Sequence, residues 1–250
     1  MKIKYLCFVL LLTWVAGACS KDDDNDGFRD DGRFSKRKVS RIYVSEGEEK
    51  GFNLIFEYNG RGEIARITES WVDKDSTVYE FTFTDDAVCM TKVYNYPGRR
   101  GSSFTMIRPL NEQLYVARCT TGVHSYDAEG HLLTTGRDTL KWEAGNLVEG
   151  NEKSDIEYLE YKYTDVENKS NIDFSMAMFY HYYRPDWYDD YLDALGYYGK
   201  TNRNLLASTR YCTYTYKYDK KGYVIAFTEK PTSKNIDFNE PTTYKVEYYD

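Results

Sequence analysis

The densest group of side chains that could do chemistry lies in residues 179–191, where aromatic rings alternate with carboxylates and an arginine. Sugar-binding surfaces use this combination, because rings stack on the CH faces of a sugar while charged groups bond its hydroxyls. The sequence therefore suggests a glycan-binding site with the candidate residues Tyr183, Arg184, Asp186, Trp187, Asp190 and Tyr191. The alternative is that Trp187 and Tyr191 seat a helix on the core, which is the commoner role of aromatic residues in a chain with 26 tyrosines.

The same region departs from the strand-like pattern of the rest of the chain. Asp186 can cap a helix start, and Gly196 stands where a helix would end. The large apolar side chains between them recur at helical spacing and share one face: Trp187, Tyr191, Leu192 and Leu195. We expect one covering amphipathic helix near residues 186–195, lying on a sheet face or closing an open edge.

Carboxylates in this helix raise a second chemistry, glycoside hydrolysis. That reaction needs two carboxyl groups flanking a cleft. The acidic residues here share one helix: Asp186, Asp189, Asp190 and Asp193. We therefore interpret the protein as non-catalytic, with a carboxylate-dependent glycoside hydrolase as the lesser alternative.

Two of the three histidines flank a predicted hairpin turn at residues 127–130. Antiparallel pairing would place Tyr126 opposite His131, with His124 two residues back on the same face. A metal between the imidazoles would need a third ligand, which the pattern does not supply. The acidic run after residue 21 opens like a calcium loop, but Arg33 stands where that loop needs a bidentate Glu. We predict solvent-facing histidines, no metal and no other cofactor.

The N-terminus carries an export pattern. A basic start is followed by an apolar run at residues 5–15 that is too short to span a bilayer, and then by small residues at 16–18. Cys19 at the first mature position resembles the lipidated cysteine of a lipobox, and the acidic residues after it resemble the export signal of Bacteroidetes surface lipoproteins. We expect a signal peptide at 1–18, lipidation of Cys19 and an acidic tether at 19–38. The protein would then be anchored in the outer membrane and surface-exposed, with a periplasmic location or simple secretion as alternatives.

Three cysteines remain after such processing: Cys89, Cys119 and Cys212. In an oxidising compartment at most one disulfide can join them, and the sequence leaves its connectivity open. Buried thiols that act as small apolar side chains are the alternative. A cysteine nucleophile needs a basic partner, and the sequence signals none nearby.

Composition narrows the class of fold and partner. Tyrosine suits pleated, half-buried surfaces, so its abundance favours broad sheets. The formal net charge of −7 argues against a nucleic acid partner. A recurring turn then indicates how the sheets are built: residues 216–225 (YKYDKKGYVI) have related copies at 56–64 and 125–132 and a contracted copy at 141–148. Asp or Asn opens each full copy and Gly closes it, as in hairpin turns.

Short alternating segments continue through the body, including residues 39–44, 52–58, 78–84, 87–96, 103–107, 114–120 and 244–249. They predict one all-β domain over residues 39–250, a curved antiparallel meander that forms an open or partial barrel.

Three segments resemble a family of Bacteroidetes lipoproteins defined as a domain of unknown function with a porin-like fold. They are residues 138–148 (DTLKWEAGNLV), 171–174 (NIDF) and 195–205 (LGYYGKTNRNL), and the resemblance extends over about residues 39–250. The turns are also similar to the YD repeats of large secreted β proteins. The resemblance implies a curved sheet or partial barrel and brings no catalytic residues. We therefore expect a binding or scaffold module for a glycan or partner protein, with a purely structural envelope component as the alternative.

Overall fold

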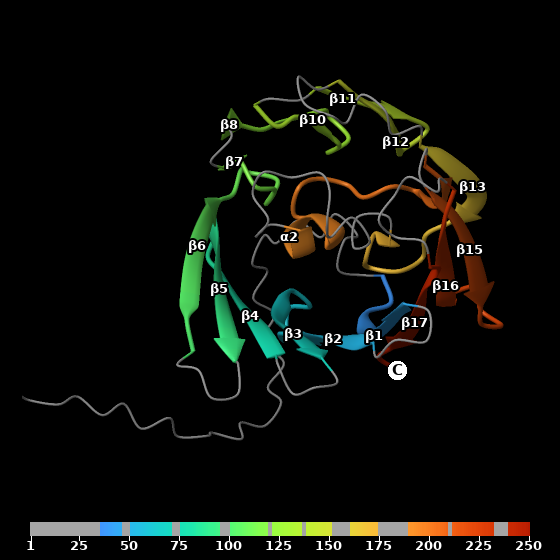
Figure 1. The fold of residues 1–250 in the computed structure, drawn as a ribbon. Coiled ribbons are helices and arrows are strands. Elements are labelled where there is room, and N and C mark those ends of the chain that lie inside the picture. Colours follow the sequence, from blue (N-terminus) through green and yellow to red (C-terminus); the bar gives the residue numbers. More distant parts are fainter. Residues whose placement is uncertain are drawn as a thin grey trace, which may run out of the picture.

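The computed structural model describes residues 36–46, 51–71, 76–95, 101–119, 122–136, 139–151, 161–174, 190–209, 212–232 and 240–250. One large antiparallel sheet of eleven strands curves around the short helix α2 (Asp190–Ala194), and a smaller four-stranded sheet lies across its open side (Figure 1). The predicted all-β architecture with a covering helix is confirmed, and the large sheet is not closed into a barrel.

The large sheet takes its strands from both ends of the chain. The first half supplies β1 (Val39–Glu46), β2 (Phe52–Tyr58), β3 (Ile64–Trp71), β4 (Ser76–Phe83), β5 (Ala87–Asn95) and β6 (Ser103–Pro109). The second half supplies β13 (Lys162–Glu167), β14 (Asn204–Ser208), β15 (Cys212–Tyr218), β16 (Val224–Pro231) and β17 (Thr242–Tyr248). Between them, β9 (Ser125–Tyr126), β10 (Leu132–Thr134), β11 (Thr139–Glu143) and β12 (Asn146–Asn151) form the smaller sheet, and β7 (Arg118–Cys119) and β8 (Gly122–Val123) form a hairpin.

The large sheet consists of two meanders that join side by side through the first and last strands of the chain. Sequential strands are neighbours from β13 to β17 and from β1 to β6, and the two runs join where β1 pairs with β17. Ile42 lies opposite Val246 in this seam, and Val44 lies opposite Tyr244. The first and last strands of the large sheet in sequence order therefore pair with each other, and local sequence patterns do not predict this pairing.

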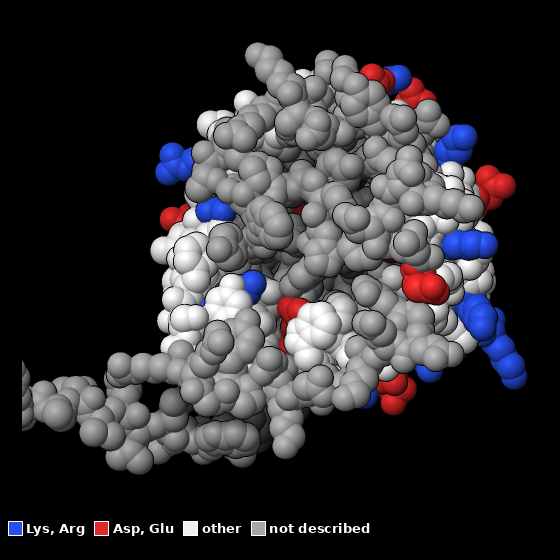
Figure 2. Space-filling view, in the orientation of Figure 1, with Lys and Arg blue, Asp and Glu red and all other residues white. Residues whose placement is uncertain are grey.

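Alternation along the strands separates a packed concave face from a solvated convex face. Concave side chains such as Phe56, Ile67 and Phe227 are buried in the main core. On the convex side, Arg66 lies 2.9 Å from Glu80 in a cross-strand ion pair. Figure 2 shows charges of both signs interspersed along the side where β13, β15 and β16 lie. Burial of the concave apolar side chains is the main force that curves the sheet around α2.

The predicted turn copies share one set of hydrogen bonds. In the turn at residues 219–222, Asp219 Oδ1 accepts from the backbone N–H groups of Lys221 (2.8 Å) and Tyr223 (2.9 Å). Gly222 closes the turn at a φ of 81°, a left-handed conformation that glycine adopts without strain. The turns that begin at Asn59 and Asp127 repeat these bonds. The contracted copy is a two-residue turn in which Ala144 (φ 51°) and Gly145 (φ 78°) are both left-handed, as a type I′ hairpin requires.

A fourth full copy of the turn begins at Asn111. Asn111 Oδ1 accepts from the N–H groups of Gln113 (3.0 Å) and Tyr115 (2.9 Å), and Leu114 occupies the glycine position with a φ of 61°. The strand predicted over residues 114–120 is therefore wrong at its start. Leucine is disfavoured in this conformation, so the sequence did not signal a turn there.

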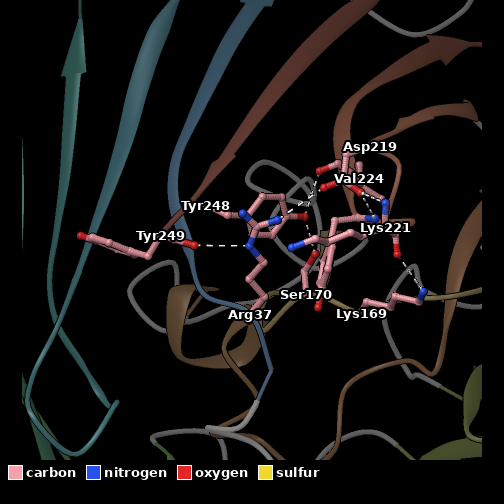
Figure 3. Close-up of polar contacts among 9 residues, drawn as sticks. Arg37, Lys169, Ser170, Asp219, Lys221, Val224, Tyr248 and Tyr249 are labelled. Atoms are coloured by element: carbon pink, nitrogen blue, oxygen red, sulfur yellow. Dashed lines mark hydrogen bonds and ion pairs between the residues drawn. The ribbon is translucent and has the colours of Figure 1, made fainter.

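The seam between β1 and β17 is fastened to one of these turns by Arg37. Its Nη1 lies 3.4 Å from Asp219 Oδ2, and its Nε donates to the carbonyl of Tyr249 at 3.3 Å. The guanidinium also lies over the rings of Tyr223 (5.0 Å) and Tyr248 (4.9 Å). Figure 3 shows Arg37 reaching past Tyr248 towards the turn. This cluster joins the start of β1, the end of β17 and the β15–β16 turn.

Helix α2 packs inside the curve of the sheet. Leu192 is fully buried, and Gly196 lies just beyond the end of the helix, where its φ of 80° and its N–H bond to the Asp193 carbonyl (2.8 Å) form the expected glycine cap. The part of the predicted helix at 186–189 lies outside the described residues. Within the described part of the chain, no helix has the length and apolar character needed to cross a membrane.

Candidate functional site

Segments that carry the family resemblance converge on a buried polar network. Asp173 Oδ2 accepts from both the backbone N–H and the side-chain amide of Asn202, each at 2.9 Å. Asn202 Oδ1 in turn accepts from the backbone N–H of Leu147 (2.8 Å) and the hydroxyl of Tyr163 (2.9 Å). Asp173 and Asn202 are almost completely buried. These motif residues therefore dock the loop 199–203 onto the β11–β12 hairpin, which is a structural role.

The docked loop forms one wall of a pocket of about 650 Å³. The turn at residues 127–130 and the β11–β12 hairpin line the same pocket beside this loop. Contact is close, because Lys200 N donates to the Gly130 carbonyl (2.8 Å) and Arg203 N donates to the Gly145 carbonyl (2.9 Å). We call this cavity the His131–Trp142 pocket.

Besides Tyr115, the described aromatic lining of the pocket consists of His131 and Trp142. Their rings stack with centroids 4.8 Å apart, and the indole N–H of Trp142 donates to the Leu132 carbonyl at 2.7 Å. His131 Nδ1 lies 2.9 Å from Asp127 Oδ2. Burial of the Asp127 carboxyl favours its neutral form, but hydrogen bonds from the His131 side chain and backbone and from Gly130 outweigh this, so the pKa of Asp127 is lowered. The imidazole is therefore held in place by an ionised carboxylate.

Charges of both signs line the remainder of the pocket. The cations are Lys36, Lys200 and Arg203, and the carboxylates are Asp127, Glu129 and Glu167. Burial lowers the pKa of Lys36, although the negative charges of Asp173 and Glu167 act in the opposite direction. The Lys36 ammonium donates to the Asn168 carbonyl at 3.1 Å. Among the described residues, the lining therefore contains three cations and three carboxylates, and neither sign dominates.

Most residues of the glycan site predicted from sequence lie outside the described residues: Tyr183, Arg184, Asp186 and Trp187. The same holds for Cys19 and for the side chain of Asp190. Tyr191 is described; it is buried in the core and its ring meets Tyr79 edge-on at 4.8 Å. That placement is the helix-seating role, and the glycan role of the other residues stays a prediction.

The histidine geometry differs from the prediction in two ways. Tyr126 pairs with Leu132, while the backbone N–H of Asp127 donates to the His131 carbonyl, because the turn closes one residue further along the chain. His124 and His131 are both buried, so the expected solvent-facing positions are wrong. Each ring has its own partners: His131 contacts Asp127 and Trp142, and His124 contacts Cys119. No group of three His, Cys, Asp or Glu side chains in the described segments is arranged to hold a metal.

The cysteines Cys89, Cys119 and Cys212 are present as thiols, and no disulfide joins these three. Cys119 Sγ lies 3.3 Å from His124 Nε2. A basic partner for a cysteine, which the sequence did not signal, therefore exists five residues along the chain. The hairpin of β7 and β8 brings the two side chains together.

Comparison with protein-family models finds no match, and comparison with curated proteins finds none. Among solved structures, the chain is similar to a porin-like protein from Bacteroides uniformis, with a TM-score of 0.57 and 14% identity over 84% of this chain and 96% of that chain. A porin-like protein from Bacteroides vulgatus gives a TM-score of 0.36 and 11% identity over 85% of this chain and 99% of that one. This TM-score is too low to show a shared fold. The first likeness shows the fold, and the porin-like fold implied by the sequence is confirmed.

Proposed function

We propose that this protein is a non-catalytic binding module of the cell envelope that binds a neutral glycan in the His131–Trp142 pocket. The observation that carries the proposal is the lining: an aromatic surface beside three cations and three carboxylates in a cavity of about 650 Å³. Aromatic rings and paired charges together recognise polyhydroxylated ligands, since rings cover CH faces and charged groups bond hydroxyls. A charge-balanced lining favours a neutral ligand over a phosphate or nucleic acid.

Attachment to the envelope is part of the same proposal. It rests on the export pattern of residues 1–18 and on Cys19, which would carry the lipid. The acidic residues after Cys19 would act as the signal for surface export and as the tether between the lipid and the domain. Mass spectrometry of the mature N-terminus in its native cell would test this: a diacylated Cys19 is expected, and an unmodified N-terminus would contradict it.

A glycan array probed with the full chain tests the binding role. The informative variant is Glu129→Ala/Lys200→Ala, since both side chains line the pocket and are exposed, so their removal should leave the fold intact. The matched control is Lys220→Ala/Lys221→Ala, which changes two exposed residues of the equivalent turn at residues 219–222, outside the pocket lining. We expect affinity to fall by about tenfold or more, equal to about 1.4 kcal/mol, in the pocket variant alone.

The array also separates this pocket from the site predicted on the helix. Loss of binding in a folded Trp187→Ala variant, with full binding in the pocket variant, would move the site to residues 183–191. A chain that binds no glycan, with all variants folded, would overturn the binding role and favour a structural envelope component.

A further inference from the structure

The hairpin of β7 and β8 holds a thiol against an imidazole. Cys119 is the last residue of β7, and His124 follows β8 directly. Across the hairpin, Cys119 pairs with Gly122. The backbone N–H of His124 donates to the Ala117 carbonyl at 2.9 Å, which extends the hairpin and fixes the direction of the His124 side chain. Sγ of Cys119 and Nε2 of His124 are then 3.3 Å apart, within hydrogen-bonding distance for sulfur.

The other ring nitrogen defines the tautomer of His124. Nδ1 lies 3.0 Å from the backbone carbonyl of Val116, which can only accept a hydrogen bond, so Nδ1 must carry the proton. In the neutral ring Nε2 then presents its lone pair to Cys119 Sγ. The Val116 carbonyl also accepts from the Tyr126 hydroxyl at 2.6 Å, which holds that carbonyl in position. Buried as it is, with its ring 5.2 Å from that of Tyr198, His124 is oriented as a general base.

Cys212 shows the opposite environment for a cysteine in the same chain. Burial, followed by the nearby Glu229 carboxylate, raises the pKa of Cys212 to about 12. A carboxylate disfavours the thiolate, whereas an imidazole at hydrogen-bonding distance accepts the thiol proton and stabilises the thiolate as an ion pair. Cys119 is also only half-buried, so the residue is partly open to solvent.

We propose that Cys119 and His124 form a thiol–imidazole pair that makes Cys119, among the three described cysteines, the site of exchange with small disulfides. His124 Nε2 takes the proton of Sγ, and the thiolate attacks one sulfur of a low-molecular-weight disulfide. The S–S bond of that disulfide breaks as a mixed disulfide forms on Cys119. The leaving thiolate takes the proton from the His124 imidazolium, so protons and electrons balance. Cys119 is the nucleophile, His124 is the base, and Tyr126 is a positioning residue.

The test is the reaction of the full chain with 2,2′-dipyridyl disulfide at pH 6, followed at each cysteine by peptide mass spectrometry. Ordinary thiols are almost entirely protonated at this pH, so proton transfer within the Cys119–His124 pair should give about a tenfold faster reaction. We expect Cys119 to react at least about tenfold faster than Cys89, another half-buried thiol, and Cys212 to be slowest.

The His124→Gln variant should remove the advantage of Cys119 while leaving the rates at Cys89 and Cys212 unchanged. Those two rates also report whether the variant is folded. If it is not, the wild-type profile decides between the outcomes: the ratio of the Cys119 rate to the Cys89 rate should rise as the pH falls from 8 to 6. A Cys119 rate that equals the Cys89 rate at pH 6, or that is unchanged in folded His124→Gln, would overturn the proposal.

Discussion

The turns that begin at Asp127 and Asp219 have the same backbone but different roles. In each, Oδ1 of the aspartate accepts two backbone N–H groups, at 2.9 and 2.8 Å in the first turn and at 2.8 and 2.9 Å in the second. The second carboxylate oxygen then contacts one side chain. Asp127 Oδ2 contacts His131 in the pocket, and Asp219 Oδ2 contacts Arg37 at the seam.

The difference shows which atoms of a repeated turn are available for a role other than closing the turn. Oδ1 and the closing glycine build the turn and are the same in both copies. Oδ2 is the part of the carboxylate that the backbone does not use, and its partner differs between the copies: it is the side chain four residues along at Asp127, and Arg37 from another segment at Asp219. The turn beginning at Asn59 follows the same rule, since its side-chain amide donates to Glu63 Oε2 at 2.7 Å. A single turn design thus supports a binding pocket in one place and a sheet junction in another.

The largest effect is expected from Arg37→Ala. This change removes the contact with Asp219, the bond to the Tyr249 carbonyl and two cation–π contacts. Because the side chain is only partly exposed, the free energy of unfolding should fall by about 1–2 kcal/mol, measured by urea denaturation. Arg37→Lys keeps the charge but not the planar fork, so it should recover only part of this loss.

The comparison between the two turns is sharpened by ligand binding to the Arg37→Ala variant. Pocket affinity should match that of the wild type, because Arg37 contacts the Asp219 turn and not the Asp127 turn. A loss of both stability and affinity would mean that the two regions are energetically coupled.

Acid should weaken both turns. The pKa of Asp219 is lowered mainly by the backbone N–H groups of Tyr223 and Lys221 and by Arg37, and that of Asp127 is lowered as described above. A carboxyl group whose pKa is depressed by folding contributes stability above its unfolded pKa of about 4, and this contribution is lost as the pH falls through the folded value. Unfolding midpoints in urea should therefore decline below about pH 4.

Asp127→Asn and Asp219→Asn separate the two contributions. Asparagine keeps the turn bonds, as the turn at Asn59 shows, but it has no charge to titrate. Each variant should be less stable than the wild type at neutral pH and should lose less stability between pH 5 and pH 3. Midpoint curves that run parallel to the wild-type curve over that range would show that these carboxylates are not responsible.

The fold was largely predictable because most of its information is local. Alternating strands and Asx-Gly turns predicted most of β1 to β6 and the β15–β16 hairpin. Local patterns could not show that β17 pairs with β1, since the partners are separated by about two hundred residues. The pocket was missed for the same reason: Lys36, His131 and Arg203 come from three distant segments, and only folding brings them together. The Cys119–His124 contact could have been predicted from the sequence, because a tight hairpin between these two residues would bring their side chains together.

The turn beginning at Asn111 gives the smallest expected effect and tests the turn design itself. Leu114 holds a φ of 61°, which costs a residue with a Cβ about 1 kcal/mol compared with glycine. Because Leu114 is half-buried, its replacement also removes packing, so Leu114→Ala is the matched reference. Leu114→Gly should exceed Leu114→Ala in stability by up to about 1 kcal/mol in urea denaturation, whereas Gly62→Ala should lose a similar amount in the turn at Asn59. If Leu114→Gly is no more stable than Leu114→Ala, the left-handed φ at position 114 does not destabilise this turn. Packing of the Leu114 side chain would then be the feature that distinguishes this turn from the other copies.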